Sequence, residues 1–138
     1  MSIQDMIAQL GQGMLTSVLI YALTLIGAVP LALPLALARG GKSKIARLLT
    51  GAYISFMRGT PLMLQLIAVY FGPWYLFRIR ISDGYRFYAV IIAFVLNYAA
   101  YFAEIYRAGI AAVPKGQREA AAVLGYTNAQ AFFRIVLP

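Results

Sequence analysis

An apolar stretch at residues 86–108 carries three polar side chains at regular spacing. Asn97, Tyr101 and Glu104 follow one another at intervals of four and three residues, which places them on one face of a helix. Polar groups inside a hydrocarbon layer are costly unless they face a partner, water or a ligand. This stripe is therefore a candidate binding surface, and the carboxylate of Glu104 has the charge to hold an ammonium group.

A second group of polar residues lies at an interruption in another apolar stretch. Arg58, Thr60 and Gln65 surround the sequence R-G-T-P and offer a cation, a hydroxyl and an amide to a pathway through the protein. A structural interpretation is favoured over this one, because Gly59 and Pro61 break helices and an arginine there can extend its charge to the membrane surface.

The polar stripe also has a purely structural interpretation. Glu104 could form an ion pair with Arg58 or Arg107, and Asn97 could bond a neighbouring helix. The sequence leaves both interpretations open.

Most catalytic chemistry is absent from this chain. Cysteine and histidine do not occur, so the sequence offers no thiol nucleophile, no imidazole base and almost no transition-metal ligand set. No G-x-x-x-x-G-K-[ST] phosphate-binding loop occurs either. The sequence predicts a protein that is not an enzyme and that needs no cofactor.

Composition indicates an integral membrane protein. Hydrophobic residues make up 62% of the 138 residues, charged residues 12%, and the mean hydropathy is +0.77, far from the averages of soluble proteins. The net charge of +8 does not favour nucleic acid, because the basic residues cluster between long apolar runs, where membrane orientation explains them.

Three apolar stretches are predicted to span the membrane as helices. Residues 14–38 contain no charged side chain and exceed the roughly 20 helical residues that a bilayer requires. Residues 48–77 would measure about 45 Å as one helix, too long for a core of about 30 Å, so we expect a break near residues 58–61. Residues 86–108 form the third span.

Basic residues set the expected orientation. Eight of them lie between the first two spans or from the end of the third span onward, whereas three lie between the second span and the start of the third. The positive-inside rule then places the N-terminus outside the cell. Ile3, Met6, Ile7 and Leu10 recur at helical spacing after Ser2, a possible cap, which predicts a short amphipathic helix on the outer surface.

Residues 116–138 are predicted to form a cytoplasmic helix-turn-helix. Glu119 is expected to open the first helix, with its charge at the positive end of the helix dipole. Ala120 and Ala121 continue a flat, small face, and Gly125 stands where a left-handed cap is needed. Thr127 and Gln130 have the spacing of a capping box for the second helix.

The order E-A-A-A-V-L-G, nine residues, I-V-L-P in this segment resembles the "EAA" loop of the membrane subunits of binding-protein-dependent ABC importers. F-M-R-G-T-P-L-M-L-Q-L at 56–66, Y-F-A-E-I-Y-R-A-G-I at 101–110 and V-P-K-G-Q-R-E-A-A-A-V-L-G at 113–125 resemble recurrent segments of the polar-amino-acid family of these permeases. These segments fall within the latter two thirds of the chain.

The resemblance implies an all-α integral membrane protein, a type I importer permease-like helical bundle with three spans here and a cytoplasmic coupling loop. It also implies a bacterial inner-membrane location, cytosolic ABC ATPase subunits, a second permease subunit, an extracytoplasmic amino-acid-binding protein and an amino-acid substrate. Glu119, Ala120, Ala121 and Gly125 would couple to the ATPase. Such permeases usually continue with about two more spans, so this chain is expected to be part of a longer protein.

Two other functions remain compatible with the residues alone. A secondary transporter or channel subunit would explain the polar stripe but not the EAA-like segment. A structural membrane subunit without transport would explain the composition only.

Overall fold

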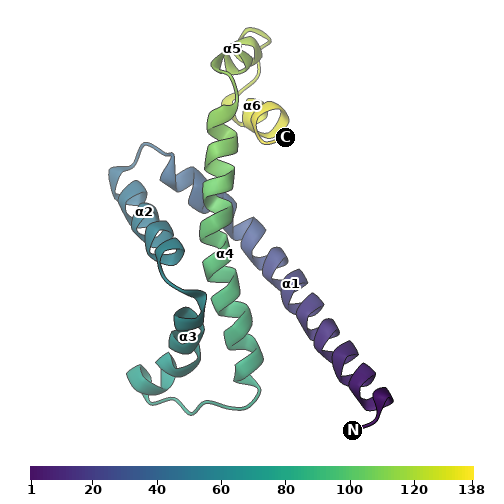
Figure 1. The fold of residues 1–138 in the computed structure, drawn as a ribbon. Helices are drawn as coiled ribbons and strands as arrows, with labels where there is room; N and C mark the ends of the chain where they lie inside the picture. Colours follow the sequence, from purple (N-terminus) through teal and green to yellow (C-terminus); the bar gives the residue numbers. More distant parts are fainter.

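Residues 1–138 form an all-helical structure, described here by a computed structural model. The expected all-α class is confirmed. Four helices make up the body, and a short helical hairpin follows (Figure 1). The elements are α1 (Ile3–Arg39), α2 (Lys44–Gly59), α3 (Leu62–Phe77), α4 (Tyr85–Ala112), α5 (Lys115–Val123), α6 (Asn128–Ala131) and a terminal π-helix, η1 (Phe132–Val136).

The helix α1 is continuous over 37 residues. Ser2 caps it, because its hydroxyl accepts a hydrogen bond from the backbone N–H of Asp5 at 3.2 Å and the Asp5 carboxylate accepts from the backbone N–H of Ser2 at 3.1 Å. The prediction of a separate amphipathic helix at the N-terminus is therefore wrong. No proline or cap interrupts residues 3–14, so the helix that Ser2 starts runs directly into the apolar stretch.

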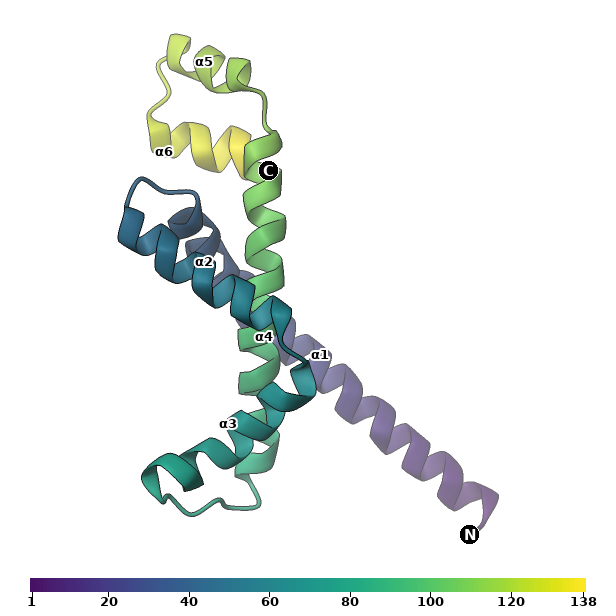
Figure 2. The same cartoon turned by 60° about the vertical axis from the view of Figure 1, so that its left-hand side comes forward.

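Small residues bring α1 and α4 into close contact. The buried residues of α1 are Thr24, Ala28, Ala32 and Ala36, each four apart. Those of α4 are also mostly alanines: Ala89, Ala93, Asn97, Ala99, Ala100 and Ala103. In a membrane the lipid is as apolar as a leucine side chain, so helices associate through close packing of small residues. The two helices cross along these faces (Figures 1 and 2).

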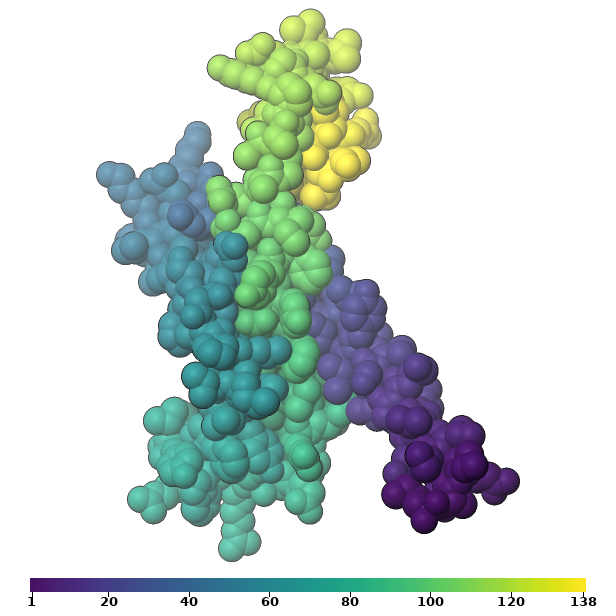
Figure 3. Space-filling model, in the orientation of Figure 1, coloured from purple at the N-terminus to yellow at the C-terminus, as the bar shows by residue number.

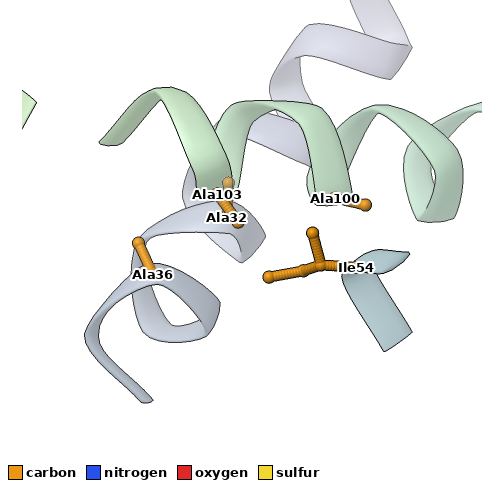
Figure 4. Packing of buried hydrophobic residues seen from close by; sticks show 5 residues of the cluster. All are labelled: Ala32, Ala36, Ile54, Ala100 and Ala103. Carbon is orange, nitrogen blue, oxygen red and sulfur yellow. The ribbon is translucent and has the colours of Figure 1, made fainter. Parts of the chain in front are cut away.

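A cluster of five buried residues marks the centre of this packing. Ala32 and Ala36 of α1, Ile54 of α2, and Ala100 and Ala103 of α4 gather where the three helices meet (Figure 4). Ile54 is the largest of them. The core is therefore thin and depends on backbones that approach closely.

The long second apolar stretch is broken, as its length predicts. Helices α2 and α3 meet at Thr60 and Pro61 with a bend of 110°. Pro61 has no backbone N–H and favours an extended residue before it, and Thr60 has that extended conformation. By length and composition, α1 and α4 can each cross a membrane, and α2 with α3 can form a third, broken span.

The two ends of the molecule differ. The turn from α1 to α2 and the hairpin after α4 lie toward one end, whereas the N-terminus and the loop from α3 to α4 lie toward the other (Figures 1 and 2). The C-terminal hairpin projects beyond the crossed helices (Figure 3).

Candidate functional site

Helices α2 and α4 bring four polar residues into one cluster: Arg58, Tyr101, Glu104 and Arg107. Glu104 on α4 accepts two hydrogen bonds from Arg107, at 3.1 Å from Nε and 2.7 Å from a terminal nitrogen. A terminal nitrogen of Arg58, in the last turn of α2, lies 3.7 Å from a Glu104 oxygen. The guanidinium of Arg58 also lies 5.7 Å from the ring centroid of Tyr101. The alternative of an ion pair at Glu104 is thus confirmed, with both predicted partners.

The charges of this cluster do not cancel. Two guanidinium groups surround one carboxylate, which leaves one excess positive charge. The side chain of Glu104 is 22% exposed and those of the arginines 46% and 45%, so the group is accessible. An ammonium ligand would have to compete with Arg107 for the carboxylate, whereas a carboxylate ligand could approach the arginines directly.

Thr60 and Gln65 close the break between α2 and α3. The Thr60 hydroxyl donates to the Phe56 carbonyl at 2.8 Å. The Gln65 amide nitrogen lies 2.7 Å from the Thr60 hydroxyl oxygen and donates to the Met57 carbonyl at 3.0 Å. These bonds satisfy carbonyls that the broken helix leaves free.

One polar atom of the Gln65 side chain makes no hydrogen bond. It is buried, with 8% exposure, and its side-chain oxygen has no hydrogen-bond partner. The amide cannot simply be reversed, because its nitrogen already faces three oxygen atoms. The segment therefore presents a buried acceptor beside the break.

Asn97 lies apart from the exposed members of its stripe. It is buried at 5% exposure among the alanines of α4, whereas Tyr101 is 40% exposed. A groove between α1 and α4 does not touch the stripe. It has a volume of about 440 Å³ and is lined by Ser17, Ile20, Tyr21, Thr24, Leu25, Phe94, Tyr98 and Phe102.

Sequence reasoning missed the polar residues of this groove. Ser17, Tyr21 and Thr24 recur on α1 at intervals of four and three, the same spacing as the stripe on α4. Thr24 is buried and its hydroxyl has no partner. Their spacing predicts a polar face on a helix, just as the spacing of Asn97, Tyr101 and Glu104 does.

Tyr53 is another residue that the sequence did not single out. Its hydroxyl donates to the backbone carbonyl of Leu96 and so ties α2 to α4. No local sequence pattern predicts this contact, because it depends on how α2 and α4 approach each other.

The helix α5 begins earlier than predicted. It starts at Lys115, after Pro114, so Glu119 lies in its second turn and no acid occupies its first turn. The expectation that Glu119 opens the helix is wrong. Proline is favoured at the start of a helix, and the V-P-K sequence sets the boundary.

Gly125 has the predicted left-handed conformation, with φ of +82°. The Tyr126 N–H donates to the Ala121 carbonyl at 3.0 Å and the Gly125 N–H to the Ala122 carbonyl at 3.1 Å. Together these bonds form a Schellman motif. The reciprocal capping box of Thr127 and Gln130 is also confirmed, with bonds of 3.0 and 3.2 Å.

The four candidate coupling residues are not equally exposed. Glu119, Ala120 and Gly125 are exposed, but Ala121 is 1% exposed. The contacts of α5 are with α6 and η1. The prediction that Ala121 lies on an outer docking face is therefore wrong, because its side chain packs inside the hairpin.

Crossed apolar helices with a broken span and a projecting capped hairpin are the features of an integral membrane subunit. The chain is a member of the binding-protein-dependent transport system inner membrane component family, whose model matches residues 28–138.

Known relatives are amino-acid permeases. The chain is 46% identical over 122 residues to the L-cystine transport system permease protein TcyL of Bacillus subtilis, covering 86% of this chain and 51% of that protein. It is 48% identical over 86 residues to the arginine transport system permease protein ArtQ of Bacillus subtilis, covering 62% of this chain and 38% of that protein. The chain thus spans about half the length, or less, of these curated relatives.

A solved structure has a similar arrangement of helices. It is described as the crystal structure of an amino acid ABC transporter with histidines. It aligns over 100% of this chain and 64% of its own, with a TM-score of 0.77 and 35% sequence identity. The expected resemblance to amino-acid ABC permeases and the all-helical permease-like fold are confirmed.

Proposed function

We propose that this chain belongs to the permease subunit of an ATP-driven amino-acid importer. Cytosolic ATPase subunits would supply the energy, an extracytoplasmic binding protein would deliver the amino acid, and a second permease subunit would complete the pathway. Family membership and the amino-acid permeases among its relatives support this proposal. The observation that carries it is the C-terminal hairpin, which projects from the body and is closed by two capping motifs.

The hairpin is suited to transmit force. It follows α4 after Val113 and Pro114, and its exposed side includes Glu119 and Ala120. Small side chains let a partner's backbone approach closely, and the Schellman turn fixes the direction of the chain. We infer that this hairpin docks on the ATPase and moves α4 when the ATPase closes.

The proposal includes the orientation of the chain in the membrane. The two most basic segments, the turn from α1 to α2 and the hairpin after α4, lie at one end of the molecule. The positive-inside rule assigns that end to the cytoplasm, so the hairpin lies inside and the N-terminus outside. Single cysteines at Ala46 and Asp83 would test this in intact cells with a membrane-impermeant thiol reagent. We expect labelling at position 83 only; labelling at position 46 only would reverse the orientation.

The substrate pathway is proposed to pass the polar cluster and the break. Arg58, Tyr101 and Glu104 offer both signs of charge to a zwitterionic amino acid. The unpartnered oxygen of Gln65, with the nearby Thr60, adds an acceptor beside the break, and Asn97 continues the stripe toward the centre of α4. In this arrangement the ammonium group of the substrate replaces the Arg107 guanidinium at the Glu104 carboxylate.

Coupling is tested with Gly125→Val in the intact subunit, reconstituted with its ATPase and binding protein. A valine cannot adopt φ of +82° without strain. We expect loss of substrate-stimulated ATP hydrolysis and of ATPase pull-down, with membrane insertion unchanged. Gly109→Val is the matched control, since Gly109 has open space around it and no positive φ. Retained stimulation and pull-down in Gly125→Val would refute the coupling role.

A further inference from the structure

A basic cavity of about 450 Å³, open to the outside, lies between the end of α1 and residues 44–55 of α2. Arg39 comes from the last turn of α1, and Lys44 and Arg47 come from the first turn of α2. The remaining lining residues are small or apolar apart from one hydroxyl: Leu48, Gly51, Ala52 and Ser55. No acidic side chain lines the cavity.

None of these positive charges forms an ion pair within the chain, although Arg39 lies close enough to Glu104 to be attracted to it through space. Both of its ion pairs use Glu104, with Arg58 and Arg107. Three like charges around one hollow repel one another unless an anion lies between them. The cavity is therefore electrostatically suited to bind an anion.

Gly51 shapes this cavity. A side chain there would meet the Arg39 guanidinium, at 3.1 Å from Nε and 3.2 Å from its central carbon. The absence of a side chain at position 51 lets Arg39 lie across α2 instead of extending into solvent. The guanidinium is thus held beside the two basic residues of α2.

The surroundings of the cavity are apolar. Arg39 directly follows 25 residues without a charge, which places the turn at the edge of a candidate span. Ile45 and Leu48 are each 73% exposed and Leu49 is 65% exposed. Basic hollows at the end of a span, next to exposed aliphatic side chains, match a ligand with an anionic head and hydrocarbon tails.

We propose that this cavity binds the phosphate-bearing headgroup of an anionic phospholipid. Arg39 and Arg47 hold the phosphate oxygens, because guanidinium groups match that geometry, and Lys44 adds a third positive charge. The acyl chains lie against Ile45, Leu48 and Leu49. The bound lipid would fix the angle between α1 and α2 at the membrane surface.

The test uses the intact subunit in nanodiscs that contain phosphatidylglycerol and phosphatidylcholine, with retained lipid counted by native mass spectrometry. The variant Arg39→Gln/Arg47→Gln should lower the affinity for phosphatidylglycerol roughly fivefold for each charge, or about thirtyfold together. Lys42→Gln is the matched control, because Lys42 lies in the same turn but does not line the cavity. An equal loss per charge in Lys42→Gln would show general surface attraction and overturn the site.

A second variant leaves the net charge unchanged. Gly51→Val places a branched side chain against the Arg39 guanidinium, which must shift to admit it. Retention of phosphatidylglycerol should fall, by at most the roughly fivefold effect of losing one charge. Gly59→Ala, in the same helix but with open space around it, should retain the lipid fully. Wild-type retention in Gly51→Val would contradict the proposed role of Arg39.

Inorganic phosphate in detergent without lipid distinguishes the source of the anion. We expect it to bind far more weakly than phosphatidylglycerol, because it cannot use the apolar surface. Equal or tighter binding of phosphate, lost in Arg39→Gln/Arg47→Gln, would make this a site for a free anion and refute the lipid proposal. No preference for phosphatidylglycerol over phosphatidylcholine would refute it too.

Discussion

The crossing of α1 with α4 and the C-terminal hairpin are held together in different ways. At the crossing, alanines such as Ala32 and Ala100 are fully buried, and close packing is the main attraction. The hairpin has one buried residue in α5, Ala121, and depends on the backbone bonds around Gly125 and the capping box at Thr127.

This difference predicts how each region responds to mutation. Added volume should damage the crossing, because neighbouring backbones must separate to admit it. The same added volume on the hairpin's exposed side has room, so the hairpin should instead be sensitive to a change in backbone conformation or in a cap. Variants in each region distinguish these two responses.

Ala100→Leu should destabilise the crossing most. Three added carbon atoms at a site with 0% exposure should lower the free energy of unfolding by about 3 kcal/mol. Unfolding of the intact subunit in mixed detergent, followed by far-ultraviolet circular dichroism, measures this. Ala108→Leu is the control, because Ala108 is exposed on the same helix; equal losses in both variants would show that close packing is not what holds α1 and α4.

Gly27→Ala tests the crossing with a single methyl group. The new Cβ would lie 2.8 Å from a Val95 methyl carbon, so we expect a loss of about 1–2 kcal/mol in unfolding free energy. Val95→Ala should recover most of it in the double variant, because it removes the clashing methyl. Simple addition of the two single effects would mean that the helices do not meet at this contact.

Sequence alone predicted the hairpin better than the crossing. Gly125 and the Thr127–Gln130 pair act over a few residues, so their types and spacing are sufficient. The break at residues 58–61 was predictable for the same reason. The partner of each alanine in α1 and α4 was not, because alanine occurs in any helix and its burial depends on which faces meet.

In the candidate site, too, contacts between residues close in sequence were easier to predict than contacts between distant segments. The possible pairing of Glu104 with Arg107 was visible from a spacing of three residues, and its pairing with Arg58 was one of two alternatives. The bonds of Gln65 across the break, and the burial of Ala121, required the relative position of two segments. Glu119 was misplaced because an E-A-A-A run resembles a helix start, although Pro114 sets the start at Lys115.

Gly125→Val should loosen the hairpin without affecting the crossing. A left-handed backbone costs an L-residue about 1–2 kcal/mol, so the open hairpin should become roughly tenfold more populated. Hydrogen exchange of amides 115–137 in the intact subunit measures this opening. Exchange in α1 and α4 should remain unchanged; faster exchange there would mean that the hairpin also supports the crossed helices.

Thr127→Ala should have the smallest effect. It removes the hydroxyl that accepts from the Gln130 N–H at 3.2 Å, and a lost N-cap costs about 1 kcal/mol. The expected result is about fivefold faster exchange at the start of α6, with the Schellman bonds of Gly125 and Tyr126 retained. Thr127→Ser keeps the hydroxyl and should exchange as the wild type does. If Thr127→Ala also exchanges as the wild type does, the cap adds nothing measurable, and the hairpin is held by the turn at Gly125 and the packing of Ala121 alone.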